Sequence, residues 1–113
     1  MKDLISYSDF TKIEIRLGTI ISAELNNKLR KPSFILKIDF GDEVGVKKSS
    51  AQLTKNYNID QLIDKQIAAV INFPKKQIGD FISDVLVLGF PDENNEAILI
   101  SPDKKLVNGG QLY

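Results

Sequence analysis

The feature that most constrains the fold is the recurrence of a large apolar side chain at every second position of residues 34–40. Every second residue of this segment is large and apolar, and Lys37 and Asp39 lie between them. Successive side chains of a strand point to opposite faces, so the segment predicts a strand with one buried face. A turn at 41–43 and a returning segment at 44–49 complete an antiparallel hairpin over residues 33–50.

Four further segments have strand character. Residues 13–23 predict one strand with a bulge at Gly18, and other strands are expected at 66–73, 81–88 and 97–100. The side chains expected to point inward are Phe34, Leu36, Ile38, Phe40, Val70, Val85 and Val87. About seven short strands linked by turns favour an all-β class, as a closed or nearly closed barrel.

Segments with helical character are short. Asn58 precedes apolar residues at helical spacing, which predicts one or two capped turns within 58–64. Ser8 or Asp9 is expected to cap a single turn that holds Phe10 and Ile13 against the core. Helices are therefore expected to be minor connections in this protein.

The length and composition indicate one ordinary globular domain over residues 1–113. The chain has 113 residues, 42% of them hydrophobic and 27% charged, without an internal repeat or a linker. It has no apolar run of the ~20 residues that cross a bilayer and no secretory signal at its N-terminus. We therefore expect a cytoplasmic protein that does not insert into membranes.

The absence of Cys and His excludes several chemistries. Disulfides, thiolate nucleophiles, Cys or His zinc sites and imidazole-based triads all require one of these residues. An enzyme that uses only carboxylates remains an alternative, but aligning two carboxylates across a cleft usually takes a larger scaffold. A binding module without a metal or cofactor is the expected class.

The zero net charge conceals a separation of charge along the chain. Residues 47–76 contain six lysines and two aspartates, whereas residues 77–113 contain six acidic and two basic residues. The fold can bring the lysines together into a basic patch, or they can belong to ordinary solvated faces. The charge pattern alone leaves both interpretations open.

Three polar segments interrupt the strand pattern, at 47–52, 72–77 and 79–84. Each lies at a strand end, and the rims of small barrels bind oligomeric ligands through cations and stacked aromatic rings. Lys47, Lys48, Lys75 and Lys76 can supply positive charge there, and hydrogen-bonding groups can come from Ser49, Ser50, Gln52, Asn72 and Ser83. Phe73 or Phe81 can supply an aromatic face, although each is also a candidate core residue, and the serines and Asn72 are equally candidates for turn bonding.

Five segments of the sequence carry a resemblance to a known family: 9–20, 38–41, 49–54, 72–76 and 83–89. With these segments the chain resembles the CsaA-type chaperones of the tRNA-binding-domain family. The wider family includes C-terminal domains of methionyl-tRNA synthetases and free-standing tRNA-binding proteins, and the Ser-Ser-Ala-Gln-Leu sequence at 49–53 distinguishes the CsaA type.

This resemblance implies an OB-fold five-stranded Greek-key barrel, with N- and C-terminal extensions that form a homodimer. It implies an export-related chaperone that binds unfolded polypeptide and also binds tRNA. Carried over by position, the family's ligand-facing site corresponds to Lys48, Ser49, Ser50, Gln52, Asn72, Lys75, Lys76 and Ser83. The alternative is a tRNA-binding accessory protein without a dedicated chaperone role. Apolar residues near the termini fit the dimer: Leu4, Ile5, Phe10, Ile98, Ile100, Leu106, Val107 and Leu112.

Overall fold

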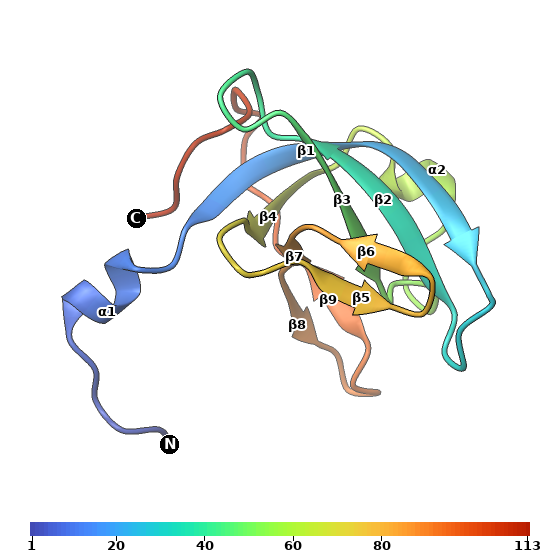
Figure 1. Ribbon diagram of the computed structural model, residues 1–113, viewed down its shortest axis with the longest axis horizontal. Coiled ribbons are helices and arrows are strands. Elements are labelled where there is room, and N and C mark those ends of the chain that lie inside the picture. The colour runs from blue at the N-terminus through green and yellow to red at the C-terminus, as the bar shows by residue number, and fades with distance from the viewer.

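The structure, a computed structural model, describes all of residues 1–113 as nine strands and two short helices (Figure 1). The helices are α1 (Tyr7–Thr11) and α2 (Ile59–Leu62). The strands are β1 (Ile15–Asn26), β2 (Ser33–Asp39), β3 (Val46–Ala51), β4 (Gln66–Val70), β5 (Lys76–Ile78), β6 (Phe81–Ser83), β7 (Leu86–Val87), β8 (Gly89–Pro91) and β9 (Ala97–Leu99).

Five strands form one antiparallel sheet in the order β3-β2-β1-β4-β7, and β5–β6 and β8–β9 are two small hairpins. The sheet curls until β3 reaches the segment between β6 and β7 (Figure 1). There the Asp84 N–H donates to the Lys48 carbonyl at 2.8 Å. The curled sheet with this closure confirms the predicted all-β class and the OB-like barrel.

The core is built largely by the alternating segment that dominates the sequence. Phe34, Leu36, Ile38 and Phe40 are all buried, and the hairpin of β2 with β3 forms as predicted. Of the other side chains expected inside, Val70 and Val85 are buried, whereas Val87 is only partly buried and packs against the core. The period of two along β2 therefore fixes which face is buried.

Gly18 does not mark the bulge that the sequence predicts. β1 is continuous through Gly18, and its irregular pairing lies between Ile20 and Ser22. A Cβ atom at Gly18 would lie 2.6 Å from Ile38 and 2.7 Å from Phe40. Glycine is needed here because two large core side chains occupy the space above its backbone.

The segment 81–88 is not the single strand expected. It divides into β6 and β7, because Asp84 leaves the strand to bond to Lys48. β5 begins at the end of the polar segment 72–77 and pairs with β6, with Lys76 opposite Ser83. The strand expected at 66–73 is also shorter, since β4 ends at Val70.

The two helices differ in how they relate to the barrel. α2 begins as predicted, with the Asn58 side chain accepting the Gln61 N–H at 2.9 Å. α1 is capped by Ser6, has no buried residue and lies beside the barrel (Figure 1). The expectation that Ile13 packs in the core is wrong, because its side chain is 40% exposed. No helix of the protein has the length and apolar character to span a membrane.

The C-terminal segment runs along the free edge of the first part of β1. Gly109 donates to the Leu17 carbonyl at 2.8 Å, and Leu17 donates to the Gly110 carbonyl at 2.9 Å. The Leu112 N–H donates to the Ile15 carbonyl at 2.8 Å. Both ends of the chain are thereby attached to the same end of β1.

Candidate functional site

A groove of about 600 Å³ lies between the β5–β6 hairpin, the β8–β9 hairpin and the end of β3. Half of its lining residues are hydrophobic, among them Leu29, Phe73 and Leu86. Four of the eight predicted site residues line it: Ser50, Gln52, Lys76 and Ser83. The groove is therefore an apolar depression with polar groups on its wall, a form typical of ligand sites.

Four hydroxyl side chains form a connected row, here called the serine seam: Ser33, Ser49, Ser50 and Ser83. Ser49 and Ser83 are buried, and both donate to the Val85 carbonyl, at 3.1 and 3.2 Å. The Ser83 hydroxyl also accepts the Ser50 N–H at 3.2 Å, and the Ser50 and Ser33 hydroxyls lie 3.1 Å apart. The seam joins β3 to the β6–β7 segment, so these serines hold the groove wall.

Asp84 contacts two of the predicted lysines beside the seam. Its carboxylate accepts the backbone N–H of Lys48 at 3.0 Å and lies 3.6 Å from the Lys75 ammonium. The Asp84 side chain is 16% exposed, whereas that of Lys75 is 73% exposed. Lys75 can leave this pair at little cost, since exposed ion pairs contribute at most about 1 kcal/mol.

The two candidate aromatic rings have different surroundings. The Lys48 ammonium lies 5.6 Å from the centre of the Phe81 ring, so one face of that ring is already occupied by a cation. Phe73 is 50% exposed and lines the groove next to Pro74 and Lys76. Phe73 is therefore the ring that is free to contact a ligand.

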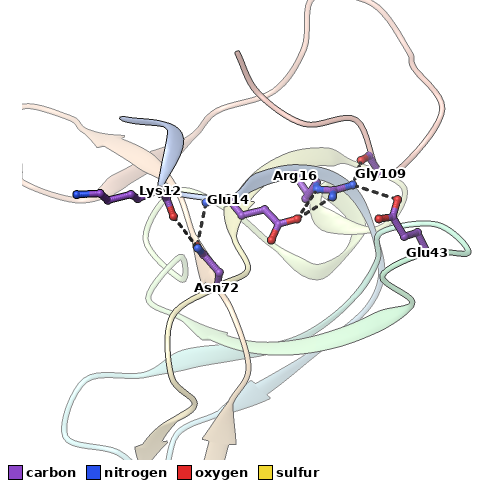
Figure 2. A network of polar contacts seen from close by, with 6 residues as sticks. All are labelled: Lys12, Glu14, Arg16, Glu43, Asn72 and Gly109. Carbon is purple, nitrogen blue, oxygen red and sulfur yellow. Dashed lines mark hydrogen bonds and ion pairs between the residues drawn. The ribbon is translucent and has the colours of Figure 1, made fainter. Parts of the chain in front are cut away.

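Gln52 and Asn72 have opposite roles. Gln52 is exposed and lines the groove, and its side chain makes no hydrogen bond within the protein. Asn72 lies outside the groove, and its side chain is fully engaged: Nδ2 donates to the Lys12 carbonyl at 2.7 Å, and Oδ1 accepts the Glu14 N–H at 2.9 Å (Figure 2). The eight predicted residues therefore do not all converge on one surface.

Sequence reasoning missed the contribution of the loop before β2. Lys31 and Leu29 line the groove, and the Lys31 ammonium pairs at 3.3 Å with Glu96 on the turn before β9. The cluster of three cations at 28–31 was the available signal, but its neighbours depend on long-range packing. Two ion pairs therefore lie at the groove, each between a lysine and a partly buried carboxylate: Lys31 with Glu96, and Lys75 with Asp84.

The β8–β9 hairpin that walls the groove is closed by Asp92. The Glu96 N–H and the Asn56 side chain donate to its carboxylate, at 2.9 and 3.0 Å, and the Asn94 N–H donates at 2.8 Å. These bonds favour the charged form and lower the pKa of Asp92 below its ordinary value. This wall of the groove is therefore held by a carboxylate.

The barrel, the apolar groove and the surrounding lysines define an OB-like binding domain. Residues 15–111 match the family described as "Putative tRNA binding domain". The chain is also 38% identical to a methionine-tRNA ligase of Methanococcoides burtonii over 112 residues, which is 99% of this chain and 16% of the ligase. The chain spans about a sixth of the length of such curated relatives.

Two solved structures resemble the whole chain. The chaperone CsaA of Bacillus anthracis has a TM-score of 0.93 and 43% identity, covering 98% of this chain and 100% of that one. The CsaA chaperone protein of Picrophilus torridus has a TM-score of 0.90 and 47% identity, covering 97% and 100%. The chain belongs to the CsaA type of the tRNA-binding-domain family.

Proposed function

We propose that this chain is a chaperone that holds extended segments of non-native polypeptide in the groove and also binds tRNA on the lysines beside it. The observation that carries this proposal is the groove of about 600 Å³, with its half-hydrophobic lining and its flanking lysines. The similarity to two solved chaperones supports the first half of the proposal, and membership of the tRNA-binding-domain family supports the second.

The groove suits polypeptide better than nucleic acid. The carboxylates of Asp84 and Glu96, 16% and 17% exposed, balance the two lysines on its lining, so the groove has no net positive charge to attract phosphate. The apolar side chains on the lining favour apolar client residues, and the free amide of Gln52 can pair with the backbone of an extended strand. We assign the groove to unfolded polypeptide, with chains awaiting export as the expected clients.

Three exposed lysines at the groove, of which Lys76 also lines it, suit the phosphate backbone of tRNA. Lys75 and Lys76 are exposed on neighbouring positions, and Lys48 is exposed on β3. Each lysine is a point charge and not a bidentate fork, which fits contact with phosphate and not the reading of bases. Phe73 next to them supplies a ring for stacking on an unpaired base.

We further propose that two copies associate through their terminal segments. α1 and the C-terminal segment enclose a hollow of about 240 Å³ lined by Tyr7, Phe10, Ile13 and Leu112. Leu4, Ile5 and Val107 are 72% exposed or more, which is unusual for large apolar side chains in a monomer. A second copy of the chain, placed by two-fold symmetry, would cover these side chains on both protomers at once.

Titration of the purified protein with total tRNA, and with a reduced carboxymethylated polypeptide that cannot fold, tests the proposal. Both are measured at about 50 mM and about 200 mM salt. We expect tRNA binding to weaken steeply with salt and polypeptide binding to change little. Failure to bind the polypeptide, with normal tRNA binding, would leave the tRNA-binding accessory protein as the function. Sedimentation at micromolar concentration tests the dimer, and a monomer would contradict it.

A further inference from the structure

One polar network connects segments that lie far apart in the sequence (Figure 2). Asn72 joins the end of β4 to the start of β1, through the Lys12 carbonyl and the Glu14 N–H. The Glu14 carboxylate accepts two hydrogen bonds from Arg16, at 3.0 and 2.7 Å, and thereby raises the pKa of the guanidinium. Arg16 also donates to the Gly109 carbonyl at 2.9 Å, so the network reaches the C-terminal segment.

Asn72 occupies the one position where this network meets the lysine-bearing loop. The next residues along the chain are Phe73, Pro74 and Lys75, and β5 then begins at Lys76. Within the loop, Lys75 makes only a weak ion pair with Asp84. The Asn72 side chain is therefore the stronger attachment of the loop that we assign to tRNA.

The same side chain fixes how the N-terminal segment leaves the barrel. Lys12 is the C-cap of α1, so Asn72 bonds to a carbonyl at the very end of that helix. α1 itself buries no side chain. This bond and the backbone bond from Ile71 to the Glu14 carbonyl, 2.9 Å long, attach the segment that follows α1 to the barrel.

We propose that Asn72 is a positioning residue that couples tRNA binding on the Phe73–Lys76 loop to association of the N-terminal segment with a second copy of the chain. The inference rests on the proposed function. Association that fixes the position of α1 also fixes the Lys12 carbonyl and the Glu14 N–H, which bond to the Asn72 amide. The Asn72 side chain then orders the Phe73–Lys76 loop. Linkage is reciprocal, so tRNA must then favour association by the same factor.

The test combines two substitutions in the full-length chain. Leu4→Asp places a charge in the fully exposed apolar N-terminal segment and weakens association, and Asn72→Ala cuts the connection. tRNA affinity and self-association are measured for the wild type, both single variants and the double variant. We expect Leu4→Asp to weaken tRNA binding roughly 5- to 10-fold in the wild type and less than about 2-fold in the Asn72→Ala protein.

Two controls separate positioning from a general loss of structure. Gln77→Ala removes another exposed amide, on strand β5 directly after the loop, whose side chain bonds only to the Gly79 carbonyl, and should leave the linkage intact. Asn72→Asp keeps the acceptor for the Glu14 N–H but loses the donor to the Lys12 carbonyl, so we expect it to reduce the linkage only in part. This graded response is one that a folding defect would not produce.

The outcomes are distinct. The coupling would be overturned if Leu4→Asp weakened tRNA binding equally in the wild type and in the Asn72→Ala protein. It would also be overturned if Leu4→Asp weakened association and left tRNA affinity unchanged. In both cases tRNA binding itself, and with it the proposed function, would stand. Absence of salt-dependent tRNA binding in the wild type would overturn the proposed function together with the inference.

Discussion

The serine seam lies beside the Phe73–Lys76 loop, here called the lysine loop. Both regions come largely from the polar segments that the sequence predicts at strand ends, but they differ in burial and in hydrogen bonding. Ser49 and Ser83 are buried, and their hydroxyls donate to a carbonyl of the barrel. Lys75 and Lys76 are exposed, and the one ion pair they form is weakly held. The Ser49 and Ser83 donors are therefore already used within the barrel, whereas the lysines have almost all of their bonding capacity free for a ligand.

This difference separates the scaffold of the site from its contact surface. A hydroxyl that satisfies a buried carbonyl contributes to stability, because leaving that carbonyl unpaired has a large cost. An exposed ammonium contributes little to stability and much to the attraction of phosphate. Substitutions in the two regions should therefore affect different measurements, and this expectation can be tested from the largest effect to the smallest.

The largest effect is expected from Ser49→Ala combined with Ser83→Ala. The pair removes both hydroxyl donors to the Val85 carbonyl and the acceptor of the Ser50 N–H. We expect the free energy of unfolding to fall by about 2–4 kcal/mol in urea denaturation. tRNA affinity should remain within about twofold where the variant is folded. Ser101→Ala, at an exposed serine, is the control. A stable double variant with weakened tRNA binding would reverse the assignment of the two regions.

A smaller effect, on a different quantity, is expected from Lys75→Ala combined with Lys76→Ala. Loss of two phosphate contacts should weaken tRNA binding by roughly one order of magnitude near physiological salt and flatten the salt slope by up to about 2. The free energy of unfolding should change by no more than about 0.5 kcal/mol. Lys104→Ala with Lys105→Ala removes the same charge from another exposed pair and should leave the salt slope unchanged.

Gln52→Ala should have a more limited effect, confined to the groove. Its side chain has no partner in the protein, so its loss leaves the barrel unchanged. We expect binding of the unfolded polypeptide to weaken by about 0.5–1.5 kcal/mol, the contribution of one hydrogen bond. The salt slope for tRNA should not change, because no charge is removed. Equal loss for both ligands in a titration would mean that they share the groove.

Local patterns predicted a large part of the fold. The alternation in 34–40 identified the buried face of β2, and Asn58 identified the start of α2, because each signal depends on neighbours within a few residues. The bulge predicted at Gly18 was wrong for the opposite reason. What requires glycine there is the packing of Ile38 and Phe40 from another strand, and no local pattern contains that information.

The candidate site was predictable in composition but not in arrangement. The polar segments at strand ends located the groove wall, since strand ends of a barrel share a rim. The sequence did not indicate that Asn72 bonds to Lys12 and Glu14, or that Lys31 pairs with Glu96. These partners are separated by tens of residues, and only the completed barrel brings them together.

The smallest effect is expected on the pH dependence of stability. It distinguishes the uncharged serine seam from the β8–β9 wall of the groove, which the Asp92 carboxylate holds. The bonds from Glu96, Asn56 and Asn94 hold the pKa of Asp92 below its ordinary value of 3.8. A carboxyl with a lowered folded-state pKa stabilises the protein above its unfolded-state value, and this contribution disappears as the pH falls through the folded-state pKa. The β8–β9 wall should therefore loosen in acid, whereas the seam contains no group that titrates there.

Urea denaturation at neutral pH and at several values below pH 3.8 tests this difference. Asp92→Asn should lower stability at neutral pH and make the decline in acid shallower than that of the wild type, because the titrating group is gone. The Ser49→Ala, Ser83→Ala protein should be less stable by a constant amount at every pH, with a profile parallel to the wild type. If Asp92→Asn instead gives the parallel profile, the charge of Asp92 does not hold the wall, and the neutral hydrogen bonds of the hairpin suffice.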